Sequence, residues 1–164
     1  MEAASDGSPV SRRQFLLGDV GGTRILTRPP WAAPETRFAE QCTRCGACSG
    51  ACPEHIITVG RDGYPQIDFR RGECTLCAAC VEVCEPGALA PAAVPWTLYA
   101  CIGDTCLALR GVVCRSCAEQ CETAAIVMRL VTGGLAVPAV RRDACTGCGA
   151  CFRVCPVSAV TMNV

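Results

Sequence analysis

Cysteine is the residue type best placed to do chemistry in this chain, because 16 of its 17 cysteines fall into four closely spaced groups. Three groups repeat the spacing Cys-x2-Cys-x2-Cys-x3-Cys, and one is stretched between its first and second members. The groups are Cys42, Cys45, Cys48 and Cys52; Cys74, Cys77, Cys80 and Cys84; Cys106, Cys114, Cys117 and Cys121; and Cys145, Cys148, Cys151 and Cys155. Thiolates at this spacing are typical ligands of 4Fe-4S clusters, which carry single electrons.

The expected ligand sets follow from a crossover between paired groups. In two-cluster proteins the first three cysteines of a run bind one cluster, and the fourth binds the neighbouring cluster. The expected sets are Cys42, Cys45, Cys48 and Cys84 for cluster 1; Cys74, Cys77, Cys80 and Cys52 for cluster 2; Cys145, Cys148, Cys151 and Cys121 for cluster 3; and Cys106, Cys114, Cys117 and Cys155 for cluster 4. The last set is the least regular, because Cys101 lies close enough in sequence to replace Cys106.

Disulfides and zinc are the two alternative uses of so many thiols. A cysteine content of about a tenth is typical of disulfide scaffolds in short secreted chains. The odd count and the two-residue gaps within each run oppose that interpretation. Structural zinc sites usually pair two Cys-x2-Cys units across a longer loop, whereas here three cysteines follow one another at a constant step.

An internal repeat indicates how the chain positions these thiols. The first group maps onto the second with a constant offset of 32 residues, and the last three cysteines of the stretched group map onto the last group with an offset of 34. Repeats of this length mark duplicated supersecondary units. We expect an N-terminal arm at 1–35, a first unit at 36–90, a linker at 91–97 and a second unit at 98–164.

Between the cysteine groups, each unit contains the pattern of a hairpin. Apolar, β-branched runs at 56–59 and 64–69, and at 126–131 and 135–140, flank short turns that contain glycine. Short helical turns are expected at 47–51 and 150–154, ahead of Pro53 and Pro156. The predicted fold class is α+β, with tandem units like those of bacterial dicluster ferredoxins, stabilised by iron-sulfur clusters.

Composition and charge argue against several classes of function. All 15 basic residues are arginine and are balanced by 15 acidic residues. Each bound cluster with its four thiolates adds roughly −2, so four clusters would bring the protein to about −8. Nucleic acid is therefore not expected as a partner. With a single histidine and no phosphate-binding glycine motif, the chain is not expected to be an enzyme.

The N-terminal region bears on the compartment. Ser11-Arg12-Arg13 resembles a twin-arginine export motif, but glycine, aspartate and arginine interrupt residues 18–24, where an apolar segment would be needed. No run of 18 apolar residues occurs that could span a membrane. We expect a cytoplasmic protein without a membrane span.

Three features beyond the cysteine spacing make the whole chain resemble the NapF family, the ferredoxin-type accessory proteins of periplasmic nitrate reductase systems. They are the early Ser11-Arg12-Arg13, the segment Arg28-Pro29-Pro30-Trp31 ahead of the first group, and the stretched group preceded by Gly103-Asp104. Because Cys106 follows Gly103-Asp104, the resemblance favours Cys106 over Cys101 as a cluster ligand.

The resemblance also implies a function and a partner. The expected function is that of a cytoplasmic protein with four 4Fe-4S clusters, which binds the precursor of the nitrate reductase catalytic subunit and assists its maturation before export. The residues expected to contact this partner are Arg12, Arg13, Arg28 and Trp31. The alternative is an electron-transfer polyferredoxin, free or as a subunit of an oxidoreductase, with redox proteins as partners. The sequence leaves open whether clusters are transferred or only carry electrons.

Overall fold

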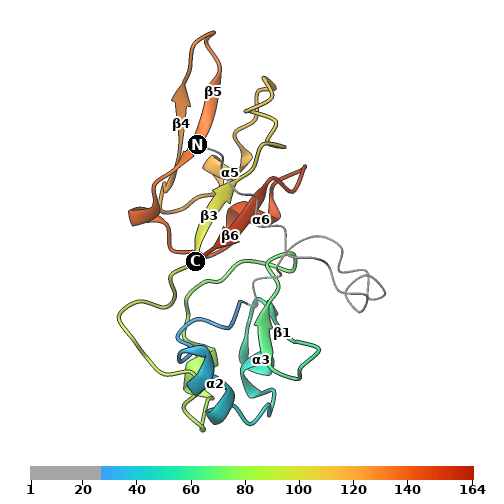
Figure 1. The fold of residues 1–164 in the computed structure, drawn as a ribbon, viewed down its shortest axis with the longest axis vertical. Helices are drawn as coiled ribbons and strands as arrows, with labels where there is room; N and C mark the ends of the chain where they lie inside the picture. Colours follow the sequence, from blue (N-terminus) through green and yellow to red (C-terminus); the bar gives the residue numbers. More distant parts are fainter. Residues whose placement is uncertain (1–26) are drawn as a thin grey trace, which may run out of the picture.

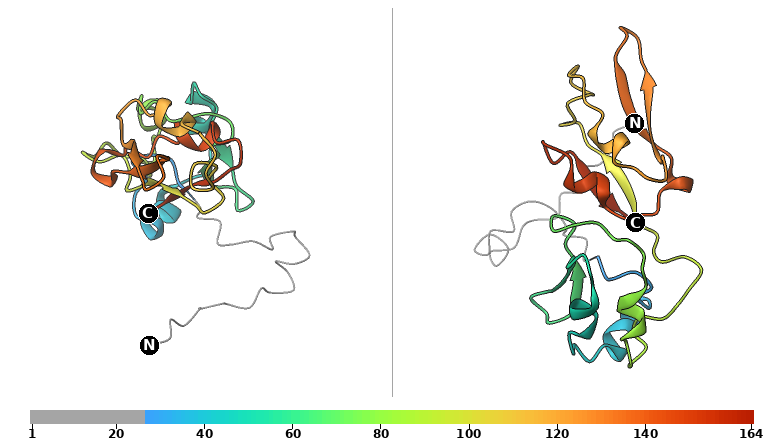
Figure 2. Two further views of the ribbon diagram at one scale, coloured as in Figure 1. Left: turned by 90° about the horizontal axis from the view of Figure 1, so that it is seen from above. Right: turned by 180° about the vertical axis from the view of Figure 1, so that it is seen from behind.

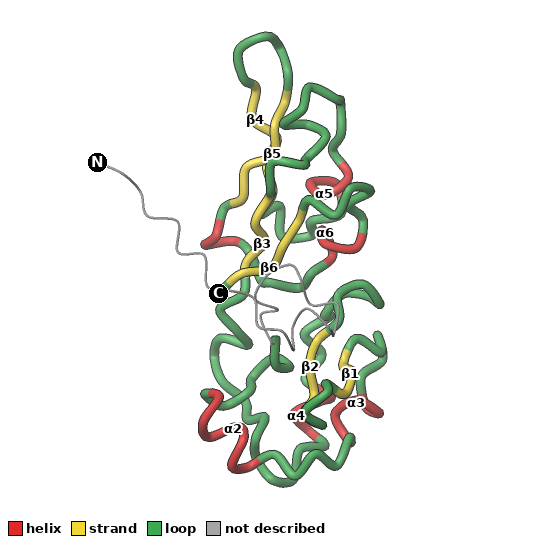
Figure 3. Tube along the Cα trace, turned by 45° about the vertical axis from the view of Figure 1, so that its right-hand side comes forward, coloured by secondary structure: helices red, strands yellow, loops and turns green. Residues whose placement is uncertain are grey.

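A computed structural model describes residues 27–164, which form two lobes stacked along the long axis of the molecule (Figure 1). The lower lobe contains the first cysteine-rich unit and the upper lobe contains the second. Most of residues 27–164 is loop, and the helices and strands there are short (Figure 3). The mixture of helices and small sheets agrees with the predicted α+β class. No helix within residues 27–164 is long and apolar enough to cross a membrane.

The first unit is built around one hairpin and three helices. Its elements are α2 (Glu35–Gln41), α3 (Ala47–Ala51), β1 (Ile57–Val59), β2 (Pro65–Ile67) and α4 (Ala79–Glu82). Strands β1 and β2 pair in antiparallel fashion, with Ile57 opposite Ile67. This confirms the predicted hairpin, although both strands are shorter than the apolar runs that predicted them.

The second unit has a longer hairpin and an additional strand pair. Its elements are β3 (Tyr99–Ile102), α5 (Ser116–Glu119), β4 (Ile126–Leu130), β5 (Ala136–Val140), the 3-10 helix η1 (Arg142–Ala144), α6 (Ala150–Arg153) and β6 (Val160–Asn163). The β4–β5 hairpin, which the sequence predicts, projects at the top of the upper lobe (Figure 1). The antiparallel pairing of β3 with β6 is not predicted, because no turn signal joins strands so far apart in sequence.

A glycine in the left-handed backbone conformation precedes each of two short helices. Gly46 (φ 79°) precedes α3 and Gly149 (φ 83°) precedes α6. Glycine adopts this conformation without the steric penalty that a Cβ atom imposes. Helix α3 packs against α4, and α5 packs against α6, so the helices that follow paired cysteine runs lie side by side. The predicted helices at 47–51 and 150–154 are confirmed, the second ending at Arg153.

Each unit has its own small core. In the first unit Phe38, Ile56 and Leu89 are almost fully buried, and in the second Leu98, Ile126 and Val160 are. Of the 20 buried apolar residues within residues 27–164, 11 are Cys or Ala. The side chains of the cores are therefore small, and sulfur forms a considerable part of their walls.

Residues 27–33, within the described part of the predicted arm, lie along the first unit and make hydrogen bonds to the linker. Ala33 N–H donates to the carbonyl of Ala88 (3.0 Å), and Ala90 N–H donates to that of Trp31 (3.1 Å). The indole Nε1 of Trp31 donates to the carbonyl of Ala92 in the linker (2.9 Å). This segment therefore packs as an edge of the first unit rather than extending away from it.

The two units meet where the loop after β2 reaches the start of α6 (Figure 2). Phe69 from this loop belongs to the buried core of the second unit, where its ring contacts those of Trp96 (centroids 6.0 Å apart) and Phe152 (6.2 Å). Cys74 N–H donates a hydrogen bond to the carbonyl of Cys148 across the boundary (2.8 Å). The two units thus share apolar and polar contacts.

Candidate metal centres

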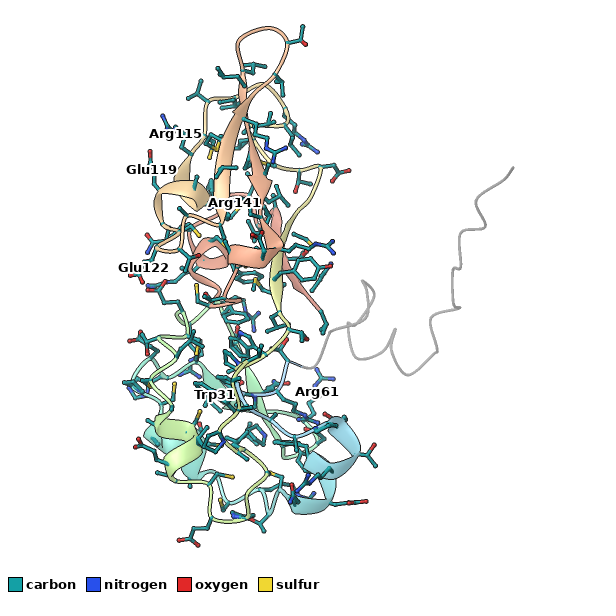
Figure 4. The ribbon with its side chains drawn as sticks, turned by 90° about the vertical axis from the view of Figure 1, so that its left-hand side faces the viewer. Trp31, Arg61, Arg115, Glu119, Glu122 and Arg141 are labelled. Carbon is teal, nitrogen blue, oxygen red and sulfur yellow. The ribbon has the colours of Figure 1, made fainter. Side chains whose placement is uncertain are left out.

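Four hollows in the structure each have four cysteines on their walls. Their cysteines are Cys42, Cys45, Cys48 and Cys84 in the first; Cys52, Cys74, Cys77 and Cys80 in the second; Cys121, Cys145, Cys148 and Cys151 in the third; and Cys106, Cys114, Cys117 and Cys155 in the fourth. Sulfur atoms accordingly occur through both lobes (Figure 4). These groupings coincide with the four sets that the crossover rule gives. The assignment of each thiolate as a ligand stays a prediction.

A shared backbone conformation curls the three regular cysteine runs. The residues just before and just after the second cysteine all have positive φ: Arg44 and Gly46, Leu76 and Ala78, and Gly147 and Gly149. For arginine, leucine and alanine this conformation costs about 1–2 kcal/mol each. Strain of this kind persists where the surrounding structure or a function requires it. Here it wraps each run around a hollow.

The buried sulfurs are difficult to ionise without a bound cation. Burial and, after it, the neighbouring thiolates together raise the pKa of Cys74 to about 11 and those of Cys80 and Cys151 to about 12. Iron in a cluster supplies the positive charge that holds such thiolates deprotonated. The set of soft, closely grouped donors therefore fits an iron-sulfur cluster.

Hydrogen bonds to sulfur offset part of this cost at the fourth cysteine of three groups. Backbone N–H groups of Leu89, Ala125 and Ala159 donate to the sulfurs of Cys84 (3.3 Å), Cys121 (3.2 Å) and Cys155 (3.1 Å), respectively. Burial raises the pKa of Cys121, but hydrogen bonds from Thr123 and backbone N–H groups outweigh it and the pKa is lowered. Such bonds help to set the reduction potential of a cluster.

The two units differ in how far their sulfurs are exposed. Cys45 and Cys77, both in the first unit, are exposed, whereas every cysteine of the second unit is at least partly buried. The pKa of Cys45 is lowered, chiefly by a hydrogen bond from the backbone of Ala47. The candidate sites of the first unit are thus more accessible to solvent.

The remaining cysteine, Cys101, lies on β3 and is not among the residues that line the fourth hollow. Its sulfur accepts a hydrogen bond from Nδ2 of Asn163 on the paired strand β6 (3.4 Å). Cys106 does line the fourth hollow and is buried.

None of the 17 cysteines forms a disulfide. Among residues 27–164, no group of three or more His, Cys, Asp or Glu side chains is arranged to hold a single metal ion.

Two of the four residues expected to contact a partner are engaged within the first unit. The guanidinium of Arg28 donates to the carboxylate of Glu35, to Asp62 and to the carbonyl of Pro65, and it lies 5.1 Å from the ring centroids of Phe38 and Tyr64. Its side chain is only 10% exposed. No local spacing rule relates Arg28 to these groups, so the sequence did not reveal them.

Trp31 is the second engaged residue, and it lines the second hollow in the lower lobe (Figure 4). Arg12 and Arg13 lie outside the described residues. The structure therefore places Trp31 beside a candidate metal site and Arg28 in the packing of the first unit, and each also makes hydrogen bonds to other segments of the chain.

Comparisons with known proteins agree with this arrangement. The family model of the 4Fe-4S dicluster domain matches residues 41–88 and again residues 112–159. Two dicluster segments correspond to four clusters, and the second match begins after Cys106. The chain is 41% identical over 152 residues to the ferredoxin-type protein NapF of Escherichia coli K12, covering 92% of this chain and 93% of that protein.

Two further relatives share this similarity. The ferredoxin-type protein NapF of Haemophilus influenzae is 40% identical over 163 residues, covering 93% of each chain. The ferredoxin-type protein NapG of Escherichia coli K12 is 33% identical over 163 residues, covering 85% of this chain and 70% of that protein. The similarity to the two NapF proteins thus extends through both cysteine-rich units.

Proposed function

The chain belongs to the NapF family of ferredoxin-type 4Fe-4S proteins, and from this premise we propose that it is an accessory protein of a periplasmic nitrate reductase. It binds the cytoplasmic precursor of the catalytic subunit and assists its maturation before export. The observation that carries the proposal is the similarity to NapF over 92% of the chain. Four thiol-lined hollows at the expected positions support it.

In this proposal the two units are ferredoxin-like and are stabilised by two clusters each. The sixteen grouped cysteines hold the clusters in the four sets given above, with Cys106 rather than Cys101 in the fourth. A bound 4Fe-4S cluster supplies one-electron reduction or oxidation. The chain's own residues bind the iron through thiolates, donate N–H groups to sulfur and bury the second unit's sites.

The first unit, whose candidate sites are the more exposed, and residues 1–35 before it form the proposed partner-binding end. Cys45 and Cys77 are exposed there, and Trp31 lies beside the second hollow. Arg12 and Arg13 precede this end in the chain and supply positive charge for an acidic face of the partner. Arg28 and Trp31 contribute indirectly, because their hydrogen bonds hold residues 27–33 against the first unit and the linker.

Anaerobic affinity capture from cytoplasm tests this function. The full chain should retain the precursor of the nitrate reductase catalytic subunit and hold about 16 irons per chain, as four clusters require. A double substitution, Arg12→Ala with Arg13→Ala, should weaken capture while the iron content is unchanged. Substituting Arg110 and Arg129 in the second unit is the matched control. Capture of no precursor by an iron-replete protein would refute the maturation role.

An electron-transfer polyferredoxin is the second candidate function. The observation that favours it is the contact between Cys74 and Cys148, which joins a site of one unit to a site of the other. Such a protein should accept electrons from one redox partner and reduce another in repeated turnover, without any precursor bound. A maturation factor that donates clusters would instead lose iron in proportion to the apoenzyme added.

A further inference from the structure

Two candidate cluster sites from different units touch through their backbones. Cys74 belongs to the second hollow and Cys148 to the third, and the N–H of Cys74 donates to the carbonyl oxygen of Cys148 (2.8 Å). A covalent path from either sulfur to the other is therefore interrupted by a single hydrogen bond. We infer that this contact is an electron-transfer junction, which joins the candidate clusters of the two units into one electron-transfer chain. The packing of Phe69 against Gly149 positions it.

The four sites also follow one another in a fixed order. Within the first unit, helix α3, which carries Cys48 of the first site, packs against helix α4, which carries Cys80 of the second. Within the second unit, helix α6, which carries Cys151 of the third site, packs against helix α5, which carries Cys117 of the fourth. Between the units, the hydrogen bond from Cys74 to Cys148 makes the corresponding contact between the second and third sites. The sites thus run in the order 1, 2, 3, 4 along the chain of contacts.

The boundary between the two units is packed, so separating Cys74 from Cys148 would require breaking contacts between side chains. The ring of Phe69 leaves the first unit and is buried in the core of the second. It lies against Gly149 so closely that a Cβ atom on this glycine would overlap the ring. A second contact holds the loop that carries Cys148: the indole Nε1 of Trp96 donates to the carbonyl of Thr146 (2.7 Å), two residues before Cys148. These residues position the ligand loops and are not expected to bind iron.

The redox step at this junction is a simple exchange of one electron. A reduced cluster on one side is oxidised, an oxidised cluster on the other side is reduced, and no bond or proton is transferred. The electron enters from a one-electron donor, for which dithionite serves as the probe. The inference depends on the cluster assignment of the proposed function, but not on the identity of the partner.

The test compares Phe69→Ala with the unsubstituted protein, both fully loaded and reduced by dithionite. Electron paramagnetic resonance measures magnetic interaction between reduced clusters, and the iron content confirms that all clusters are present. Interactions within each unit should remain in the variant, whereas the additional interaction between units should be lost. Unchanged spectra and unchanged spin relaxation in an iron-replete variant with an opened boundary would overturn the inference.

Hydrogen exchange shows whether the boundary has opened. The peptide that contains the Cys74 amide should be protected in the unsubstituted protein and should exchange faster in Phe69→Ala. If protection is unchanged, Phe69 does not position the junction and that part of the inference is wrong. These measurements require no nitrate reductase, so failed precursor capture and a failed junction are distinguishable.

Two glycine variants provide a matched pair if Phe69→Ala loses iron. Gly46 and Gly149 occupy the same place in their Cys-Gly-Ala-Cys runs and have similar φ values of 79° and 83°. A Cβ at Gly46 meets nothing within 4 Å, whereas one at Gly149 overlaps Phe69. Gly149→Ala should abolish the inter-unit interaction and the protection of Cys74, and Gly46→Ala should retain both. Equal behaviour of the two variants would contradict the inference.

Discussion

The guanidinium of Arg28 makes two hydrogen bonds to the carboxylate of Glu35, of 3.0 Å from Nε and 2.7 Å from Nη2. The pair joins the segment before α2 to the start of that helix, and Arg28 also reaches Asp62 in the turn between β1 and β2 (3.4 Å). Three parts of the first unit are therefore joined by one side chain.

Arg28→Ala should destabilise the first unit. The substitution removes charged hydrogen bonds and the contacts of the guanidinium with the rings of Phe38 and Tyr64, at a cost of about 2–3 kcal/mol. The midpoint of anaerobic thermal unfolding should fall by several degrees. Arg37→Ala, at an exposed position on helix α2, is the control and should leave the midpoint unchanged. Equal midpoints for both variants would show that the Arg28 contacts contribute nothing.

The contribution of the Arg28–Glu35 pair should depend on pH. The hydrogen bond from Arg28 lowers the pKa of Glu35 below its ordinary value of 4.5. Because the folded-state pKa is lowered, the stabilisation is complete above about pH 4.5 and is lost as the pH falls through the folded-state pKa. The difference in thermal midpoint between the unsubstituted protein and Glu35→Gln should therefore shrink in acid. Glu40→Gln, exposed on the same helix, should show no such trend.

Single cysteine substitutions should separate the two candidates for the irregular site. Cys106 lies on the wall of the fourth hollow, whereas Cys101 is hydrogen bonded on a strand. Cys106→Ser should lose up to about four irons per chain, or leave a three-iron cluster, and Cys101→Ser should retain the full complement. Iron and acid-labile sulfide counts on anaerobically purified protein measure this. The reverse pattern would move the ligand to Cys101.

Removal of the clusters should unfold the protein. The cores are small, and much of their buried apolar surface is Cys or Ala, so the side chains alone provide little packing to hold each hollow together when no iron is present. Binding of metal is then part of the free energy of folding. Anaerobic treatment with a strong iron chelator should abolish the circular dichroism spectrum of the folded protein and the slow exchange of its amide hydrogens. A colourless apoprotein that stays well folded would contradict this dependence.

The clusters of the first unit should be lost before those of the second. Cys45 and Cys77 are exposed, whereas all ligands expected in the second unit are at least partly buried. With a limiting amount of chelator, iron release should pause when about half of the iron has gone, since each unit holds two of the four clusters. Hydrogen exchange should then increase within residues 36–90 and remain slow within residues 98–164. A uniform loss from both units would argue against this difference in access.

The cysteine spacing and the local turn patterns determined a large part of this protein. The four cysteine groups, the repeat, the helices after Gly46 and Gly149, and both hairpins could be recognised, because each depends on residues close together in the chain. The resemblance to the NapF family rested on similar short segments, and the comparisons confirmed it.

Only the tertiary structure decided how the units are joined. The insertion of Phe69 into the second core joins the units, while the pairing of β3 with β6 and the contacts of Arg28 act within one unit each; all of them connect residues far apart in sequence or without a local spacing rule. Such contacts depend on surfaces that distant segments form only when the chain folds, so no local spacing encodes them. For the same reason the sequence contained the four groups of thiols, whereas the fold determined that the second and third sites meet at Cys74 and Cys148.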